Sequence, residues 1–479
     1  MPSLKPYPAY KNSAVPWLGE VPEHWEVHPN RALFAEVKDQ NHPEEPLLSV
    51  TITRGVIPQD RLLTETSKKD SSNLDKSKYK LVQTGDIAYN KMRAWQGAIG
   101  ASNHRGIVSP AYIVQRPRPG LSAEYVHHLL RTPAFAKEAE RWSYGISSDQ
   151  WSLRAEHFKM IYSVRPPIEE QTAIVRFLGH VDRKIQRVIR AKQKLIKLLE
   201  EEKQVLIHRA VTGQIDVRTG KPYPAYKPSG VEWLGDVPEH WEVAPLRRRW
   251  EVRDCKHLTV PFVEDGIPLI SVREAQHFDL DPSSAKRTTL DWYKKLIDGG
   301  RKPQRGDLIY CRNVGVGAAT FVDSDEQLAM GQDVCLIRSR AQNQRYLNYF
   351  LHSPAMQNQL SIILIGSTFD RINVASIKAL LVVVPPKAEQ DAIAVHLDEL
   401  LTGLEGATAS IKVQISLLRE YRTRLVADVV TGKLDVREAA ANLPAEPEAE
   451  MEAPEPEDDL DLPQAAEEEG SYDGGQEED

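Results

Sequence analysis

The chain has 479 residues, which suggests about three domains and suffices to bury several hydrophobic cores. Its apolar content of 41% and charged content of 27% are those of globular proteins. The first residues hold no apolar run typical of a secretion signal, and no stretch is apolar enough to cross a membrane. The cysteines Cys255, Cys311 and Cys335 form no C-x-x-C pair, which argues against disulfides and structural zinc and predicts a cytoplasmic location.

The charge is distributed unevenly along the chain. Residues 441–479 contain 16 Asp and Glu and no Lys or Arg, so the net charge of −7 becomes +9 for residues 1–440 once this tail is removed. A basic body indicates a polyanionic partner such as nucleic acid. The Pro, Glu and Ala content predicts a disordered tail over 438–479. We interpret it as a solubilising appendage, and a DNA mimic that screens basic surfaces is the alternative.

The chain is a tandem repeat. Residues 5–27 and 221–243 are identical at 19 of 23 positions, and both contain KPYPAY and the motif Pro-Glu-His-Trp-Glu-Val. The end of each copy repeats as well, because Val-Thr-Gly-x-x-Asp-Val-Arg occurs at 211–218 and 430–437. A period of about 220 residues indicates a duplicated domain pair, since solenoid repeats run about 20–50 residues.

Each copy begins with a mixed globule, over about 28–164 and 244–383. Short β-like runs at 111–115, 333–337 and 380–384 alternate with helical stretches at 123–130 and 344–351. This pattern predicts an α/β (α+β) fold. Between a few shared positions, such as Gly85-Asp86 and Gly306-Asp307, the two globules differ in sequence.

A long helix follows each globule. After a Pro-Pro pair, apolar residues recur with steps of four and three, as in a coiled coil. The expected buried positions in the first copy are Ile174, Leu178, Val181, Ile185, Val188, Leu195, Leu199 and Leu206. Gly213 and Gly432 are placed as C-caps.

The two helical stripes are expected to pack on each other as an antiparallel pair, although each could instead cover its own globule. Such a pair relates the copies by a pseudo-two-fold axis and places the globules at opposite ends of a rod. The segment KPYPAY joins the end of the first helix to the second copy, whereas nothing similar follows the second helix. We therefore expect the N-terminal KPYPAY to pack beside the end of the second helix and close a ring.

Catalytic motifs are not recognisable. The stretch from Gly315 to Thr320 is no dinucleotide loop, and there is no phosphate-binding G-x-x-x-x-G-K-[ST], no H-E-x-x-H and no Asn-Pro-Pro-Tyr of amino-methyltransferases. The sequence therefore predicts a non-catalytic protein with no metal site. A repeated entry segment is typical of a surface that binds one partner twice, while divergent globules are typical of two different readers.

These residues resemble the specificity subunit of type I restriction-modification systems. The resemblance rests on the duplicated globules, Pro-Pro-x-x-Glu-Gln at 166–171 and 385–390, the heptad helices, Pro-Glu-His-Trp-Glu-Val, and Gly-Ser-Thr-x-x-Arg-Ile at 366–372. It covers residues 5–437. The first copy departs from the pattern at 145–150, where the Arg-Ile of the last motif is replaced.

The resemblance implies five parts. They are an N-terminal target recognition domain (1–164), a first spacer helix (165–218), a C-terminal target recognition domain (219–383), a second spacer helix (384–437) and the tail (438–479). Each recognition domain would read one half of a split double-stranded DNA site. Two modification subunits, which methylate adenine with S-adenosylmethionine, would dock on the chain. A restriction subunit would add cleavage and ATP- and Mg-dependent translocation, and no cofactor is expected in this chain.

Candidate DNA contacts are polar, basic and aromatic residues in the divergent loops, because such side chains reach phosphates and base edges. In the first copy they are Arg54, Asn90, Lys91, Arg93, Trp95, Gln96, Ser148, Gln150 and Trp151. In the second copy they are Arg273, Arg312, Asn313, Thr368 and Arg371. For any single residue, ordinary solvated surface is an equally good interpretation.

The candidate docking residues come from the repeated motifs. They are His24, Trp25, Glu170 and Gln171 in the first copy, and His240, Trp241, Glu389 and Gln390 in the second. Packing within the chain is the alternative for each His-Trp pair. Competing functions for the whole protein are a coiled-coil scaffold, an orphan DNA-binding regulator and, less favoured, a fused methyltransferase.

Overall fold

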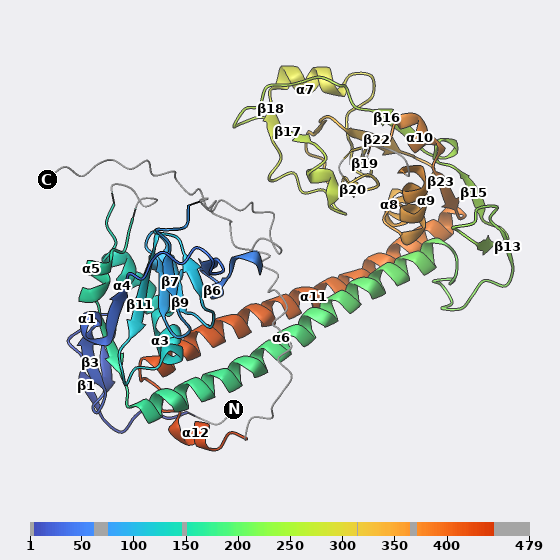
Figure 1. Ribbon diagram of the computed structural model, residues 1–479. Helices are drawn as coiled ribbons and strands as arrows, with labels where there is room; N and C mark the ends of the chain where they lie inside the picture. Colours follow the sequence, from blue (N-terminus) through green and yellow to red (C-terminus); the bar gives the residue numbers. More distant parts are fainter. Residues whose placement is uncertain (1–3, 62–74, 146–150, 314, 365–370, 445–479) are drawn as a thin grey trace. The chain divides into compact units, whose positions relative to one another are not determined.

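The computed structural model describes residues 4–61, 75–145, 151–313, 315–364 and 371–444. The chain divides into two compact units, residues 1–190 with 415–479 (unit 1) and residues 191–414 (unit 2). Two helices of 44 residues each, α6 (Ile168–Val211) and α11 (Lys387–Val430), continue from one unit into the other (Figure 1). The expected mixture of helix and sheet with two long helices is confirmed. The predicted five-part division remains a prediction.

A four-stranded antiparallel sheet with the order β4-β11-β8-β9 forms the centre of unit 1. Its strands are Phe34–Val37, Tyr112–Pro117, Ile87–Asn90 and Ile99–Ala101. The short helices of this unit are α1 (Asn30–Leu33), η1 (Ala94–Gln96), α3 (Ala123–Leu130), α4 (Pro133–Arg141) and α5 (Ala155–Met160). Apolar side chains such as Ile87 and Val114 are fully buried here because the helices cover the sheet.

Unit 2 repeats this sheet in the order β16-β22-β19-β20. Its strands are Glu251–Asp254, Val334–Arg338, Leu308–Cys311 and Ala319–Phe321. The short helices are η3 (Leu246–Arg248), η4 (Glu274–Gln276), α7 (Leu290–Ile297), α8 (Gln344–Leu351), α9 (Pro354–Leu364) and α10 (Val374–Ala379). The strands expected near 111–115 and 333–337 and the helices at 123–130 and 344–351 are confirmed.

Smaller strand pairs complete both units, and some are shared. The pairs common to both are β1-β2 (Tyr10–Asn12, Glu20–Pro22) and β3-β12 (Glu26–Pro29, Tyr162–Arg165), matched by β13-β14 (Tyr226–Pro228, Asp236–Pro238) and β15-β23 (Glu242–Pro245, Leu381–Val384). The others differ: β5-β6 (Leu48–Thr51, Gly55–Pro58) and β7-β10 (Lys80–Val82, Gly106–Val108) in unit 1, and β17, β18 and β21 (Ile267–Ile270, Arg287–Thr288, Ala329–Met330) in unit 2. The copies therefore share a framework and diverge in the insertions around it.

The glutamine of each Pro-Pro-x-x-Glu-Gln motif ties the start of a long helix to its globule. Gln171 donates to Pro166 O at 2.8 Å and accepts from Ser122 N at 2.7 Å. Gln390 makes the same bonds, to Pro385 O at 2.8 Å and from Asn343 N at 2.9 Å. Because Ser122 and Asn343 are the N-caps of α3 and α8, one buried amide joins two helix starts in each copy.

The helices α6 and α11 pair in an antiparallel manner within the units. In unit 2, Lys192 donates to Gln414 at 2.6 Å and Lys203 to Glu405 at 2.9 Å, so the partner number falls as the position on α6 rises. In unit 1, Asp182 and Arg422 form an ion pair. The antiparallel coiled coil expected from the heptads is therefore present.

The heptad register of α6 holds only for its first half. Ile174, Leu178, Val181 and Ile185 are buried as expected. The prediction of burial is wrong for Val188 and Leu195, because their exposed fractions are 42% and 44% while the neighbouring Ile189 is buried. An α-helix has 3.6 residues per turn and drifts from a strict 3.5-residue repeat, so a step of four from Ile185 to Ile189 restores the buried face.

The N-terminal segment packs on the end of α11, as the ring interpretation predicted. Asp435 N donates to Lys5 O at 2.8 Å, and Tyr10 Oη donates to Lys433 O at 3.2 Å. In unit 2, where the chain is continuous, Asp216 N donates to Lys221 O at 2.8 Å. Equivalent contacts therefore join each entry segment to the end of one long helix.

The Thr-Gly ends of the long helices require glycine. Gly213 and Gly432 have φ angles of +77° and +82°, as predicted for C-caps. A Cβ atom on either glycine would lie 2.4 Å from the ring of Pro238 or Pro22, respectively.

We expect Gly213→Ala to destabilise the protein by about 2–4 kcal/mol, because it combines left-handed strain with a clash against a proline ring. Denaturant unfolding would measure the loss, and Gly432→Ala should behave alike. Gly403→Ala is the matched control, since a Cβ there meets nothing within 4 Å on α11. Equal stabilities of the Gly213 and Gly403 variants would contradict the packing described.

Near the end of the described chain, unit 1 contains helix α12 (Arg437–Ala441), so the first residues of the segment expected to be disordered are helical. Ala440 is buried against the unit, which explains the helix. The remainder of the tail, from residue 445, lies outside the described residues. Among the described helices, none combines the length and the apolar character needed to cross a membrane.

Candidate nucleic-acid interface

In unit 1 the candidate loop Asn90–Gln96 follows the end of β8 and lies beside residues 151–153. Lys91 O accepts from Leu153 N at 2.7 Å, and the Trp95 and Trp151 rings are 5.6 Å apart. Two stretches that the sequence analysis named as separate candidates therefore lie side by side. Ser148 and Gln150 lie outside the described residues.

Arg131, at the end of α3, joins this loop to the turn that carries Arg54. Its guanidinium donates to Ile99 O and Ile52 O, both at 2.8 Å, and to Thr53 O at 2.7 Å. Burial lowers the pKa of Arg131 to about 10. Arg54 is exposed at the turn. Sequence reasoning missed Arg131, because nothing in the local sequence distinguishes an arginine that binds main-chain carbonyls of two distant segments from any other arginine.

The first-copy candidates differ in exposure. Arg54 and Gln96 are exposed, whereas Asn90, Lys91, Arg93, Trp95 and Trp151 are half-buried. Asn90 also accepts from Met92 N at 2.9 Å through its side chain, and Trp95 donates its indole N–H to Met92 O at 2.9 Å. Hydrogen bonds within the loop therefore fix its shape, while its basic and aromatic side chains remain partly exposed to solvent.

We expect Arg131→Ala to loosen both segments and to weaken DNA binding through the first copy by about 1–3 kcal/mol, since charged hydrogen bonds to main-chain carbonyls are lost. Binding titrations with a specific duplex would measure the change. Arg141→Ala is the control, because Arg141 is exposed on α4 and forms a 3.8 Å ion pair with Glu138 of the same helix. Unchanged affinity with a folded Arg131 variant would show that the clamp does not support binding.

The corresponding loop of unit 2 follows the end of β19 and meets residue 371. Asn313 and Arg371 form an isolated β-bridge, and Ile372 N donates to Arg312 O at 2.9 Å. Arg371 is exposed and lies 3.1 Å from Asp333, and Arg273 is exposed at the start of η4. Thr368 lies outside the described residues.

Arg312 is not an exposed DNA contact, which corrects the sequence interpretation. Its side chain is only 7% exposed and forms an ion pair with Asp254. A buried guanidinium needs a carboxylate partner, and β16 supplies one beside the loop. Arg312 therefore fixes the loop from inside.

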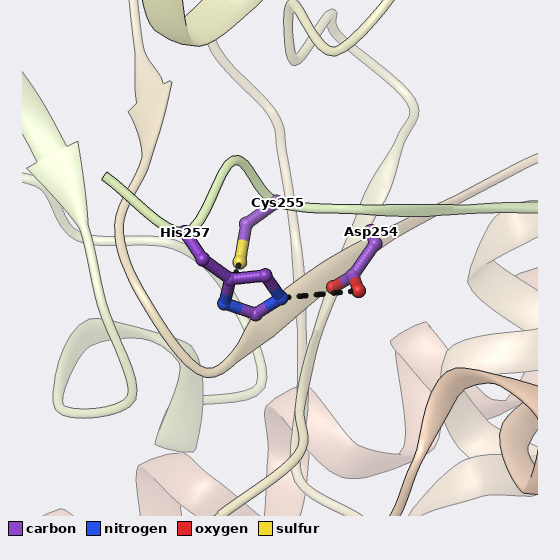
Figure 2. Close-up of side chains that lie close together, drawn as sticks. All are labelled: Asp254, Cys255 and His257. Carbon is purple, nitrogen blue, oxygen red and sulfur yellow. Dashed lines mark hydrogen bonds and ion pairs between the residues drawn. The ribbon is translucent and has the colours of Figure 1, made fainter.

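Asp254 also belongs to a small group with Cys255 and His257, shown in Figure 2. His257 Nε2 lies 3.3 Å from Asp254 Oδ2, and the Cys255 sulfur lies 3.9 Å from His257 Nδ1. Burial raises the pKa of the Cys255 thiol, and the Asp254 carboxylate is neutralised by Arg312. A divalent cation would have to displace both the proton of the Cys255 thiol and the Arg312 guanidinium that pairs with Asp254. We therefore interpret these side chains as a structural network.

The predicted docking residues are mostly internal, which corrects their assignment to a partner surface. Trp25, Trp241, Gln171 and Gln390 are fully buried, and Glu170 and Glu389 are each 6% exposed. Only His24 and His240 keep substantial exposure, with side-chain values of 42% and 47%. The packing alternative holds for the tryptophans.

These residues form one network that occurs in each unit. Glu389 accepts from Tyr223 Oη and from Trp241 Nε1, both at 2.9 Å, and lies 2.8 Å from His240 Nε2. Glu170 accepts from Tyr7 at 3.2 Å and Trp25 at 2.9 Å and lies 2.6 Å from His24. Arg218 and Arg437 approach the two carboxylates at 3.6 and 3.3 Å. The repeated motifs are therefore explained by an internal joint between entry segment, helix start and helix end.

Comparison with known protein families finds a match for part of the chain. Residues 283–415 match the type I restriction modification DNA specificity domain. In this domain and in its duplicated architecture, the chain resembles the specificity subunits of type I restriction-modification systems. The matched residues begin within the second globule and end in α11, so they include the second-copy candidate loop.

Two specificity subunits and one solved structure illustrate the relationship. The chain is 22% identical over 291 residues to the MjaVIII specificity subunit of Methanocaldococcus jannaschii, covering 58% of this chain and 64% of that protein. It is 23% identical over 210 residues to the EcoKI specificity subunit of Escherichia coli, covering 42% and 44%. A chain from a study of assembly and conformational transition in the type I R-M system aligns with a TM-score of 0.65 at 15% identity, over 86% of this chain and 99% of that one. This last likeness concerns the fold.

Proposed function

We propose that this specificity subunit is the non-catalytic DNA reader of a type I restriction-modification complex. One observation carries the proposal: the same four-stranded sheet occurs in both units, and at the same strand end it presents loops of different sequence. A duplicated framework with divergent loops suits the reading of two different half-sites in double-stranded DNA. The positive charge of residues 1–440 suits phosphate binding.

The proposal includes the partners of the complex. Two modification subunits would dock on the repeated framework and methylate adenine with S-adenosylmethionine. A restriction subunit would supply ATP- and Mg-dependent cleavage and translocation. Among the predicted docking residues, His24 and His240 have exposed side chains and are therefore the candidates for partner contact, while the chain itself contributes sequence selection.

A salt titration tests the DNA part of the proposal. The logarithm of the affinity for duplex DNA should fall with the logarithm of salt concentration by about 0.9 per neutralised phosphate, or about a thousandfold between 50 and 200 mM for six contacts. Fluorescence anisotropy with the full complex and with the chain alone would measure it. A flat response would contradict phosphate binding and favour the scaffold alternative.

Deleting the gene tests the biological part. Loss of one split, asymmetric methylated-adenine motif from the host genome is the expected result. An unchanged methylation map beside steep salt dependence would instead support an orphan DNA-binding regulator. Binding of S-adenosylmethionine by the isolated chain would revive the fused methyltransferase.

A further inference from the structure

A basic face runs along the part of α6 that belongs to unit 1. Arg176, Arg183, Arg187 and Arg190 are spaced by seven, four and three residues, so at 3.6 residues per turn they lie on one side of the helix. Arg183, Arg187 and Arg190 are exposed, and α6 has no Asp or Glu between Arg183 and Leu199. Within the described residues, neither Arg187 nor Arg190 takes part in an ion pair.

This face is peculiar to the first copy. The equivalent positions of α11, which are 219 residues later, are Val395, Thr402, Gly406 and Ala409. The rest of the two long helices shares start, cap and pairing, so the four arginines are not required by the helix framework. They indicate a function that only α6 has.

The described end of the chain lies against the same face. After α12 the chain continues to Leu443 and Pro444, whose carbonyl oxygens accept from Arg176 Nη2 at 3.1 and 3.3 Å. The remaining 35 residues, 445–479, carry all 16 acidic residues of the tail and no Lys or Arg. A strongly acidic segment therefore begins at one end of a basic helical face.

The geometry and the chain length agree. The distance along the helix from Arg176 to Arg190 is about 21 Å at 1.5 Å per residue. The 35 residues that follow Pro444 span at most about 115 Å at about 3.3 Å per residue, so the chain is long enough to reach the whole face from Pro444. Tethering gives it an effective concentration of about millimolar, well above that of a free competitor.

We propose that the acidic segment 445–479 occupies the basic face of α6 formed by Arg176, Arg183, Arg187 and Arg190 and withholds this face from other polyanions. The contact is electrostatic and exposed, so salt weakens it. DNA that meets the chain away from its recognition loops has to displace the segment. The segment then acts as an intramolecular competitor of non-specific DNA.

Zero-length carbodiimide cross-linking of the full chain, read by mass spectrometry, tests the contact directly. Lys184 lies next to the face and is exposed, so amide cross-links from tail carboxylates to Lys184 are expected at low salt. They should disappear in the variant Arg183→Glu/Arg187→Glu/Arg190→Glu. The matched control, Lys11→Glu/Lys137→Glu/Arg141→Glu, removes three exposed cations elsewhere in unit 1 and should keep them. Absence of Lys184 cross-links in the unaltered chain would overturn the proposal.

A second arm measures the consequence with a non-specific 30-base-pair duplex. Truncation after Pro444 should raise the affinity at 50 mM salt by about tenfold, and this gain should vanish in the triple glutamate variant. Truncation without effect in the unaltered chain would contradict competition. If the triple variant loses DNA affinity while no tail cross-link forms, the face contacts DNA and the proposal is wrong. The cross-linking arm uses no DNA, so its outcome is independent of the proposed reading of a DNA site.

Discussion

Replacing Glu389 with alanine is expected to destabilise unit 2 by about 3–5 kcal/mol, since it leaves buried donors without an acceptor. Tyr223 and Trp241 are buried, and both donate to this carboxylate at 2.9 Å. Water cannot replace the lost acceptor at either group without opening the joint between the entry segment and α11. Denaturant unfolding, followed by the fluorescence of the tryptophans, would measure the loss.

The repeat provides an internal test of this expectation. Glu170→Ala should cost a similar amount in unit 1, because Tyr7 and Trp25 donate to Glu170 in the same way. Glu239→Ala is the control, since Glu239 is exposed in the same entry segment. Glu389→Gln keeps an acceptor oxygen and should lose less than the alanine variant. An alanine variant as stable as the Glu239 control would mean that the network is not energetically important.

The same network predicts a dependence on pH. Burial raises the pKa of Glu389, but the hydrogen bonds from Trp241, His240 and Tyr223 outweigh burial, and the net result is a pKa below the usual value. The native carboxyl therefore holds its proton less tightly than the unfolded one does, whose pKa is about 4.3. The stabilisation is present above about pH 4.3 and is lost as the pH falls through the lower native pKa. Glu389→Gln should flatten this acid limb.

Exchange of residues 244–383 for those of another specificity subunit is expected to change one half of the methylated DNA site and to leave the other half intact. The exchanged segment begins in β15 and ends in β23, so it carries the loop after β19 and residue 371 together. The entry segment and the Glu389 network stay in place, so the fold of unit 2 is kept. Methylated-adenine sequencing of a host with the hybrid gene would measure the effect.

The reciprocal exchange of residues 28–164 controls for a general loss of function, because it should alter the opposite half-site. Each hybrid should methylate the number of genomic sites that contain both of its half-sites. A hybrid that alters both halves, or neither, would contradict the assignment of one reader to each unit. A hybrid that fails to methylate but unfolds at the normal denaturant concentration would indicate lost partner contact.

Local patterns in the sequence determined much of the framework. The identity of residues 5–27 and 221–243 established the duplication, and apolar runs identified β22 and β23 because buried strands need continuous apolar side chains. The Thr-Gly ends predicted left-handed C-caps, since few residues other than glycine adopt that conformation. The closing of the N-terminal segment on α11 followed from symmetry alone.

Burial and long-range pairing were decided only by the tertiary structure. The sequence could not distinguish the buried Arg312, neutralised by Asp254, from the exposed Arg371, because both are arginines in loops. The repeated His-Trp and Glu-Gln motifs were also assigned to a partner surface, although Trp241 donates a hydrogen bond to Glu389 inside the chain. Repetition in sequence records a repeated contact, but whether that contact is internal or external depends on which segments the fold brings together. The free-energy cost of burying a polar side chain depends on whether such distant neighbours bind it, and the local sequence pattern does not encode them.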